Sequence, residues 1–292
     1  MKLTSKQKAI LCIICSAFFF ALMNVFVRLS GDLPSIQKSF FRNFVAFFFA
    51  LIMIVKSKEG FRINHSNLGW YIGRSAFGTM GILCNFYAVD HLLISDASIL
   101  NKLSPFFAII FSFFLLKEKT TRIQASAVAI AFCGALLVVK PGFAVAGAFI
   151  PSLIGVLGGL CAGMAYTMVR ILGQKGERGP MIVLFFSAFS CIVTLPFLIF
   201  DYHPMSAAQI LTLICAGLAA AGGQFTITAA YTHAPAKEVS VYDYTQIIFA
   251  AGLGFIFFAQ IPDILSVIGY CIIAGVAIAM FIYNNRSASA NS

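Results

Sequence analysis

The sequence has 292 residues, of which 60% are apolar and only 10% are charged. A soluble domain carries about 25% charged residues and about half apolar ones, so this chain lacks the polar side chains that a water-exposed surface needs. The net charge of +10 does not indicate a nucleic-acid partner, because the charges lie in short clusters between apolar runs and form no nucleic-acid motif.

Ten apolar runs follow one another along the chain, and each approaches the length of about 20 residues that a transmembrane helix needs. They cover residues 9–29, 38–55, 69–89, 95–116, 122–140, 151–171, 180–200, 208–230, 238–259 and 264–283. Because the runs are continuous and do not alternate in polarity, they predict helices and not the strands of a membrane barrel. The linkers are short and rich in Gly and Pro, so we expect no extramembrane domain.

The first run follows three lysines and resembles a signal peptide at its start. It is too long for one, and a second run soon follows, so we interpret it as an uncleaved transmembrane helix. Cys12 and Cys15 form a CxxC motif inside this run, without a second pair or a nearby histidine. We interpret them as packing residues and expect neither a metal site nor a cofactor.

Lysine and arginine predict the orientation of the chain, because cytoplasmic segments carry more of them than external ones. With the N-terminus in the cytoplasm and alternating crossings, 13 of these residues fall in cytoplasmic segments and 3 in external ones. The sequence therefore predicts a multi-pass protein of the cell membrane with both termini in the cytoplasm.

The second half of the chain matches the first at an offset of 142 residues. The matching pairs include Val27-Arg28 with Val169-Arg170, His91 with His233, and Phe107-Ala108 with Phe249-Ala250. Five runs make an odd number, so the second copy would cross the membrane in the opposite sense, as in carriers built from inverted repeats. We predict an all-α membrane protein with ten transmembrane helices as two inverted five-helix repeats, residues 1–142 and 143–284, followed by a disordered cytoplasmic tail, 285–292.

Several short motifs resemble those of a known family. They are Phe86-Tyr87-Ala88, Ala97, Pro105, Leu115-Leu116-Lys117-Glu118, the Gly134 run before Lys140-Pro141, and Phe257-Phe258-Ala259-Gln260-Ile261-Pro262 in the second copy. On these residues the chain resembles the drug/metabolite transporter superfamily, in its ten-helix EamA-type branch. The family often has an acidic residue where Gln260 stands, which leaves Glu118 as the only acidic copy. The resemblance spans nearly the whole chain and implies a transporter of small metabolites.

Polar side chains inside the predicted spans indicate where a solute would bind, because charged and polar groups facing lipid are costly. The polar runs 101–104 and 242–246 fall on each other at the repeat offset. The predicted substrate-binding residues are Asn24, Tyr87, Asn101, Lys102, Tyr166, Gln224, Tyr242, Asp243, Tyr244 and Gln246. The alternative is a structural polar cluster between helices.

The expected depths of Lys102 and Asp243 argue against direct contact between them. With continuous helices, about 12 Å of the membrane normal separates their backbones at 1.5 Å per residue. A substrate that bridges the two positions suits this spacing. Arg42, Arg74 and Arg170 lie toward the ends of their spans, so we expect their side chains to snorkel to the interface.

The combined pattern predicts a secondary transporter that moves a small polar or zwitterionic metabolite by alternating access. The sequence has no GxxxxGK[ST] phosphate loop, so ATP is not expected to drive transport directly. A lipid translocase or a channel remains an alternative. An intramembrane enzyme is less supported, because the four histidines lie in loops without HExxH spacing and no GxSxG motif is present. The expected partners are a small-molecule substrate and membrane lipid, with the chain as a monomer or weak dimer.

Overall fold

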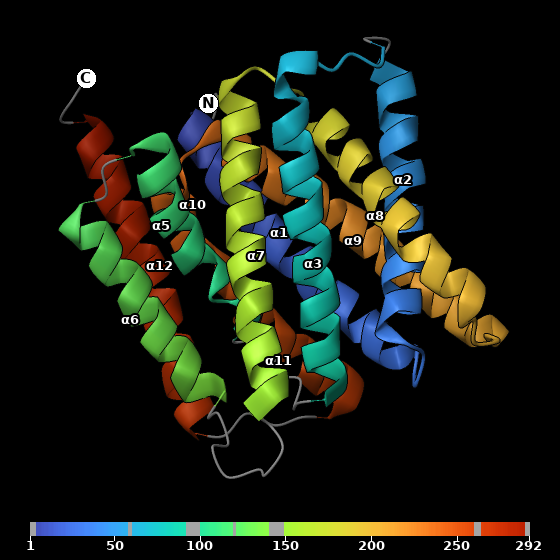
Figure 1. Ribbon diagram of the computed structural model, residues 1–292. Helices are drawn as coiled ribbons and strands as arrows, with labels where there is room; N and C mark the ends of the chain where they lie inside the picture. Colours follow the sequence, from blue (N-terminus) through green and yellow to red (C-terminus); the bar gives the residue numbers. More distant parts are fainter. Residues whose placement is uncertain are drawn as a thin grey trace.

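The computed structural model describes residues 4–57, 60–91, 100–118, 121–139, 149–259 and 264–289, and every regular element in these ranges is helical (Figure 1). The helices are α1 (Ser5–Leu29), α2 (Ser35–Ser57), the 3-10 turn η1 (His65–Asn67), α3 (Leu68–His91), α5 (Ser104–Leu116), α6 (Arg122–Val139), α7 (Phe149–Gln174), α8 (Gly179–Phe200), α9 (Ala207–His233), α10 (Ala236–Asp243), α11 (Thr245–Phe258) and α12 (Ile264–Ser289).

These helices confirm the predicted all-α membrane fold. Within the described ranges, six helices are long and apolar enough to cross a membrane, and three shorter apolar helices accompany them. The number of ten crossings stays a prediction, because residues 92–99 of the fourth predicted span lie outside the described ranges. The sequence positions of Gln260, Pro262 and Lys140 also lie outside them.

Three of the described helices begin with the same side-chain cap. The Thr4 hydroxyl accepts a hydrogen bond from the Gln7 backbone at the start of α1, and the Gln7 side chain accepts one from the Thr4 backbone. Ser206 and Gln209 repeat this reciprocal arrangement at the start of α9. Thr121 and Gln124 form it at the start of α6. Each such capping box satisfies two backbone N–H groups that a helix start otherwise leaves without a partner, and so places the first turn.

The backbone carries the repeat that the sequence offset predicts. In the described residues, the two non-glycine residues with positive φ are Lys117 (φ 54°) and Ala259 (φ 52°), which lie 142 positions apart. Both are left-handed residues that end a helix, α5 in the first copy and α11 in the second. Since non-glycine residues rarely adopt this conformation, its recurrence at the same register supports a common origin of the two segments.

The packing of helices has the symmetry of two related copies. If α1, α2, α3, α5 and α6 correspond to α7, α8, α9, α11 and α12, each contact among them that joins the two copies has its counterpart. The α1–α9 contact corresponds to α3–α7, and α1–α11 corresponds to α5–α7. The α2–α8 and α6–α12 contacts correspond to themselves. The two copies therefore interlock, since these contacts join a helix of one copy to a helix of the other.

Glycines let α7 lie close to its neighbours. A Cβ added at Gly159 would stand 2.5 Å from the Leu100 carbonyl oxygen, and one at Gly163 would stand 2.8 Å from the Ser104 oxygen. On the other side, a Cβ at Gly158 would stand 3.1 Å from the Cys84 Cβ of α3. The GxxxG spacings of this helix thus serve packing within the chain, as the sequence suggested.

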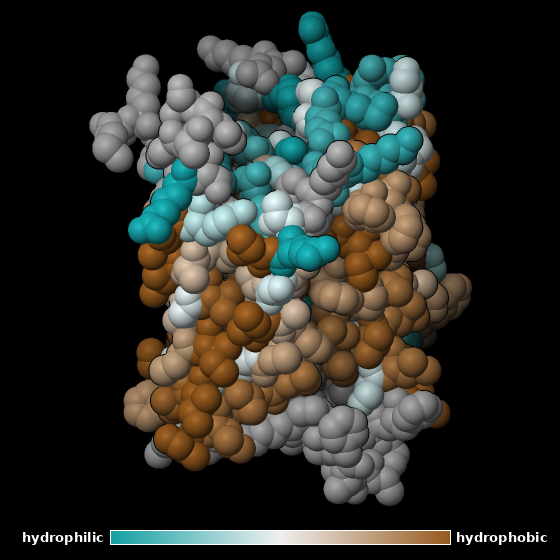
Figure 2. All heavy atoms as spheres, turned by 90° about the vertical axis from the view of Figure 1, so that its left-hand side faces the viewer, coloured by the Kyte–Doolittle hydropathy of each residue, from teal (hydrophilic) through white to brown (hydrophobic). Residues whose placement is uncertain are grey.

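The molecule has one strongly basic end, at which both termini lie (Figure 1). We call it the basic end; α1 and α3 begin there, and α2, α5 and α7 end there. Its described residues include Lys6, Lys8, Lys56, Arg62, Lys117, Arg122, Lys175, Arg178 and Arg286. Figure 2 shows hydrophilic residues gathered at this end and a mainly hydrophobic surface below it. On the opposite side of the bundle, α8 also exposes apolar side chains, such as Ile192 and Phe200, which are 71% and 89% exposed (Figure 1).

The last helix is longer than predicted. A disordered tail was expected from residue 285, whereas α12 continues to Ser289. Arg286 lies in its last turn, where a cation interacts favourably with the negative end of the helix dipole. A helix can therefore extend past its apolar span before it ends.

Candidate functional site

Two interrupted helices meet in the middle of the bundle. Leu103 (φ −70°, ψ −19°) precedes α5, and Tyr244 (φ −66°, ψ −16°) separates α10 from α11. With 8 residues, α10 is about 12 Å long and cannot cross a membrane by itself. The sequence predicted one transmembrane span over each of these regions, with a kink at Pro105 in the first of them. Pro105 in the first turn of α5 explains the first interruption, because proline cannot donate the backbone hydrogen bond that would extend the helix backwards.

Lys102 and Asp243 stand at these interruptions and form a buried ion pair. Lys102 Nζ lies 3.1 Å from Asp243 Oδ2, and the two side chains are 5% and 2% exposed. The expectation that depth keeps them apart is therefore wrong. It assumed two unbroken helices, whereas α5 and α10 pack directly against each other, and the long lysine side chain spans the remaining distance.

A polar cavity lies between the two copies, next to this pair. It has a volume of about 70 Å³. Its walls come from α1, α2, α3 and the segment before α5 in the first copy, and from α7, α8, α9 and α11 in the second. A water molecule needs about 10–15 Å³ of such space, so the cavity holds several waters. A larger organic solute therefore requires the helices to move apart.

Six of the ten predicted site residues line this cavity: Asn24, Asn101, Lys102, Tyr166, Gln224 and Gln246. The other four, Tyr87, Tyr242, Asp243 and Tyr244, are not part of its walls. Asp243 lies one contact away, because Lys102 stands between it and the cavity. That these residues bind a substrate stays a prediction.

The tyrosines outside the cavity have different surroundings. Tyr87 stacks on His91, with ring centroids 4.0 Å apart, near the end of α3. Tyr242 and Tyr244 are buried, at 2% and 0% exposure. The Tyr244 hydroxyl has no hydrogen-bond partner among the described residues, although it lies within electrostatic range of Asp243.

Arg42 on α2 lines the cavity and is only 1% exposed. Its Nη1 donates to Asn43 Oδ1 at 2.9 Å, and its Nε lies 3.4 Å from the Met23 sulfur. The prediction that Arg42 snorkels to the interface is therefore wrong. Since α2 packs against both α8 and α9, the face that carries Arg42 is enclosed by the second copy.

Arg74 on α3 also lines the cavity, and the same expectation is wrong for it, since it is 2% exposed. Its Nη2 donates to Gln224 Oε1 at 3.0 Å, and its guanidinium carbon lies 4.0 Å from the centre of the Phe186 ring. Any Cβ at Gly78 would collide with the Arg74 side chain. The missing side chain of Gly78 therefore makes room for the guanidinium group.

The cavity has more positive than negative charge. Arg42, Arg74 and Lys102 line it, and no carboxylate belongs to the walls in the described part of the chain. Arg42 and Arg74 are close enough to repel each other. Insertion measurements put the cost of such a charge at the centre of a membrane helix at about 2.5–3.5 kcal/mol. Packing alone therefore does not explain why two arginines without a counter-ion are buried here.

A helical pattern in the sequence places Arg74 on a polar face of its helix. Gly78, Gly81 and Asn85 follow Arg74 at intervals of four, three and four residues, so they share one face of the helix. All of them line the cavity. Small and polar residues on one face of an otherwise apolar helix indicate a wall that faces a polar space.

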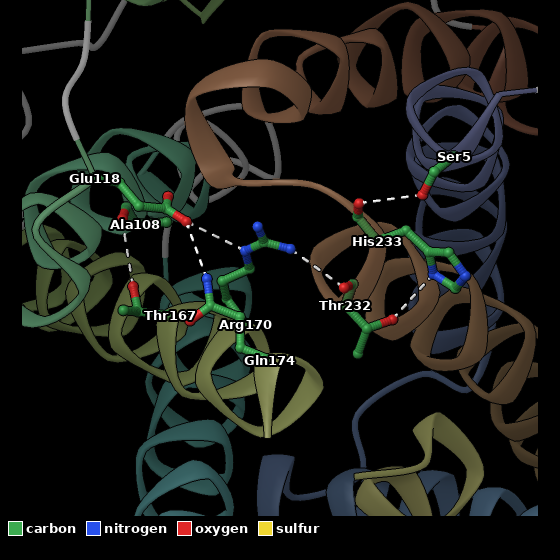
Figure 3. A network of polar contacts seen from close by, with 8 residues as sticks. All are labelled: Ser5, Ala108, Glu118, Thr167, Arg170, Gln174, Thr232 and His233. Carbon is green, nitrogen blue, oxygen red and sulfur yellow. Dashed lines mark hydrogen bonds and ion pairs between the residues drawn. The ribbon is translucent and has the colours of Figure 1, made fainter. Parts of the chain in front are cut away.

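A second polar network lies near the basic end of the bundle (Figure 3). Arg170 Nε on α7 donates to Glu118 Oε1 just after α5 at 3.3 Å, and Arg170 Nη1 donates to the Thr232 carbonyl of α9 at 3.2 Å. Gln174 adds a longer contact of 3.4 Å to the same carboxylate oxygen. The snorkelling interpretation of Arg170 is wrong, because its side chain is only 15% exposed and binds Glu118.

The doubled helical bundle, its exposed apolar surface and the polar cavity between its two copies are the features of an integral membrane protein of the transporter class. Comparison with known proteins agrees. The model of the EamA-like transporter family matches this chain twice, over residues 7–140 and 150–282. The chain therefore belongs to the EamA-like transporter family, as its motifs suggested. The two matched segments fall one in each copy of the bundle.

Individual relatives extend this result. The pseudopaline exporter CntI of Pseudomonas aeruginosa is 30% identical over 96% of this chain and 98% of its own length. Human solute carrier family 35 member G1 is 26% identical over 89% of this chain and 75% of its own length. A solved crystal structure superposes with a TM-score of 0.83 over 95% of this chain, at 13% identity. These names indicate transport and not catalysis.

Proposed function

We propose that this protein is a secondary carrier that moves a small polar organic solute across the cell membrane by alternating access. The observation that supports this most is the place of the polar cavity. Both copies contribute walls to it, and inverted repeats allow the two halves to rock around a central site. The two interrupted helices that meet there are the kind of element that carriers use near the midplane.

The network around Arg170 is proposed as the gate at the basic end. It connects α7 to the end of α5 and to α9, so this side opens only when α7 separates from both neighbours. The basic end would face the cytoplasm, in keeping with the positive-inside rule. Reporter fusions at each terminus test this orientation, and an external reporter at either end would contradict it.

The small cavity volume fits a closed intermediate of such a cycle. Ligand pockets for small organic molecules measure about 300–1,000 Å³, against about 70 Å³ here. The helices would move apart at one end to admit the solute and at the other to release it. A channel instead needs a continuous polar path, and a lipid translocase needs a groove that is open to the bilayer.

Counterflow tests this proposal directly. Purified protein is screened for thermal stabilisation by a metabolite panel, and the most stabilising compound is loaded at high concentration into proteoliposomes. A carrier then accumulates the labelled compound from outside transiently against its gradient. Steady leakage without overshoot would indicate a channel, and scrambling of fluorescent lipids without solute exchange would indicate a lipid translocase. Either result would contradict the carrier mechanism.

The direction of net transport is a separate question. The relative from Pseudomonas aeruginosa is named as an exporter, and we propose export for this chain as well. Cells that lack the protein should then retain more of the stabilising compound than cells that contain it. Higher retention in cells that contain the protein would indicate import.

A further inference from the structure

The two arginines of the cavity, Arg42 and Arg74, carry an inference about the substrate. Both side chains are almost fully buried, and neither forms an ion pair with a carboxylate in the described part of the chain. The third cation, Lys102, is already neutralised by Asp243. Two positive charges therefore remain in a space that excludes bulk water, where an uncompensated charge is strongly unfavourable.

The hydrogen-bonding capacity of the two groups is also largely unused. A guanidinium group has five N–H donors in a planar fork. Among the described residues, Arg42 donates to Asn43 and contacts Met23, while Arg74 donates to Gln224. Arg74 Nε is buried and has no acceptor there. Most donors of both forks are thus available to a ligand.

We propose that the cavity, in the carrier function proposed above, binds an organic anion with at least two carboxylate groups, one at Arg42 and one at Arg74. A carboxylate matches the guanidinium fork, because its two oxygens can accept two parallel hydrogen bonds. Two such groups neutralise both arginines. A single carboxylate leaves one charge uncompensated.

The remaining walls suit the organic part of such an anion. Phe20, Phe86 and Ile82 supply apolar surface, and Asn24, Asn85 and Asn101 supply amide groups around it. An amide offers both donors and an acceptor, so these side chains can bind hydroxyl, amine or further carboxyl groups. The Lys102–Asp243 pair carries no net charge, so the proposed anion does not depend on a substrate that bridges these two positions.

Thermal stabilisation of the purified full-length protein tests the charge requirement. The probes are succinate, glutarate and citrate. The controls are acetate and chloride, which carry one negative charge, succinamide, which carries none, and putrescine, which is positively charged. We expect a rise in melting temperature with at least one of the di- or tricarboxylates and none with the controls. No shift with any of the three acids, or an equal shift with succinamide or putrescine, would overturn the proposal. An equal shift with chloride would indicate an inorganic anion site and would also overturn it.

Arginine variants then locate the site. Arg42→Gln and Arg74→Gln should each weaken binding of the stabilising acid by about tenfold to a hundredfold, because each removes charge-assisted hydrogen bonds. Lys175→Gln is the control, since it removes one positive charge from an exposed position at the basic end. Unchanged affinity in either cavity variant, or an equal loss in the control, would contradict the assignment.

The ligand-free melting temperature separates binding from structural roles. If the arginines serve to bind an anion, each variant loses an uncompensated buried charge. The ligand-free variant should then be as stable as the parent or more stable. Arginines that only hold helices together would give variants with a lower melting temperature and intact ligand stabilisation. That combination would overturn the proposal.

The same proteoliposomes distinguish failure of this inference from failure of the carrier function. Counterflow of a neutral or cationic solute with no response to dicarboxylates would leave the carrier function intact and reject the anion. Dicarboxylate binding that depends on both arginines, without any counterflow, would support the anion site and reject the carrier.

Discussion

Two groups of buried charges in this protein use the same residue types in opposite ways. At the basic end, Arg170 faces Glu118, and their charges balance. In the middle of the bundle, Asp243 balances Lys102, whereas Arg42 and Arg74 have no carboxylate partner among the described residues. The balanced group connects helices, and the unbalanced group surrounds a cavity. The comparison teaches that the number of buried charges does not distinguish the two groups, whereas the excess of one sign does, and this excess is the basis of the proposed anion site.

The largest loss of stability is expected from Lys102→Ala. The substitution leaves Asp243 buried without its cation, and removing one partner of a buried pair costs about 3–5 kcal/mol. Thermal unfolding in detergent should therefore show a large loss of stability. Combining it with Asp243→Leu should restore most of the loss, because no charge is then left alone.

The exposed counterpart supplies the control for this test. Lys6 and Glu238 lie 3.6 Å apart with side chains that are each 24% exposed, and such pairs contribute about 0–1 kcal/mol. Lys6→Ala should accordingly change stability little. Equal losses for Lys102→Ala and Lys6→Ala would contradict the distinction between the buried pair and surface pairs.

An intermediate loss of stability is expected from Gln224→Leu. This change removes the amide that accepts from Arg74 at 3.0 Å, and hydrogen bonds to charged groups contribute about 1.5–3 kcal/mol. Gln174→Leu is the matched change at the basic end, where the contact to Glu118 is longer, at 3.4 Å, and exposed. Calorimetry of both variants should give the greater loss for Gln224. A greater loss for Gln174 would reverse the ranking of the two groups.

The smallest free energy is expected for the coupling between Arg170 and Glu118. A double-mutant cycle of Arg170→Gln and Glu118→Gln should give a coupling of about 1 kcal/mol, because the pair is only partly exposed. High salt should reduce this coupling, whereas the Lys102–Asp243 coupling should hardly change, since buried pairs are screened much less. Equal salt dependence of both couplings would contradict the difference in burial between the two pairs.

Much of the fold follows from the sequence alone. The apolar runs 9–29 and 180–200 reappear as α1 and α8 within a few residues, because lipid requires long apolar helices. The repeat was readable from a few side chains at one offset. The interruption at Tyr244 was not, because no proline or glycine marks it. Only the packing of α10 and α11 against their neighbours defines it.

The site was predictable in part for a similar reason. Asn24, Tyr166 and Gln224 were found because a polar group in an apolar helix must face away from lipid. The same rule applied to Arg42 and Arg74, but their long side chains allowed a second solution at the interface. Helical spacing tells which face a residue occupies and not which helix covers that face. The contact between Lys102 and Asp243 depends on such a partner, and so it was missed.

The interlocked contacts between the copies have a consequence for how this chain is made. The main partner of α1 is α9, and the main partner of α3 is α7. When α1 leaves the ribosome, its partner at residues 207–233 has not yet been synthesised. The early helices are therefore inserted into the bilayer before their main partners exist. The bundle can assemble only after the later helices have been inserted. The first half, expressed by itself, lacks the main packing partners of α1 and α3, and the second half lacks those of α7 and α9.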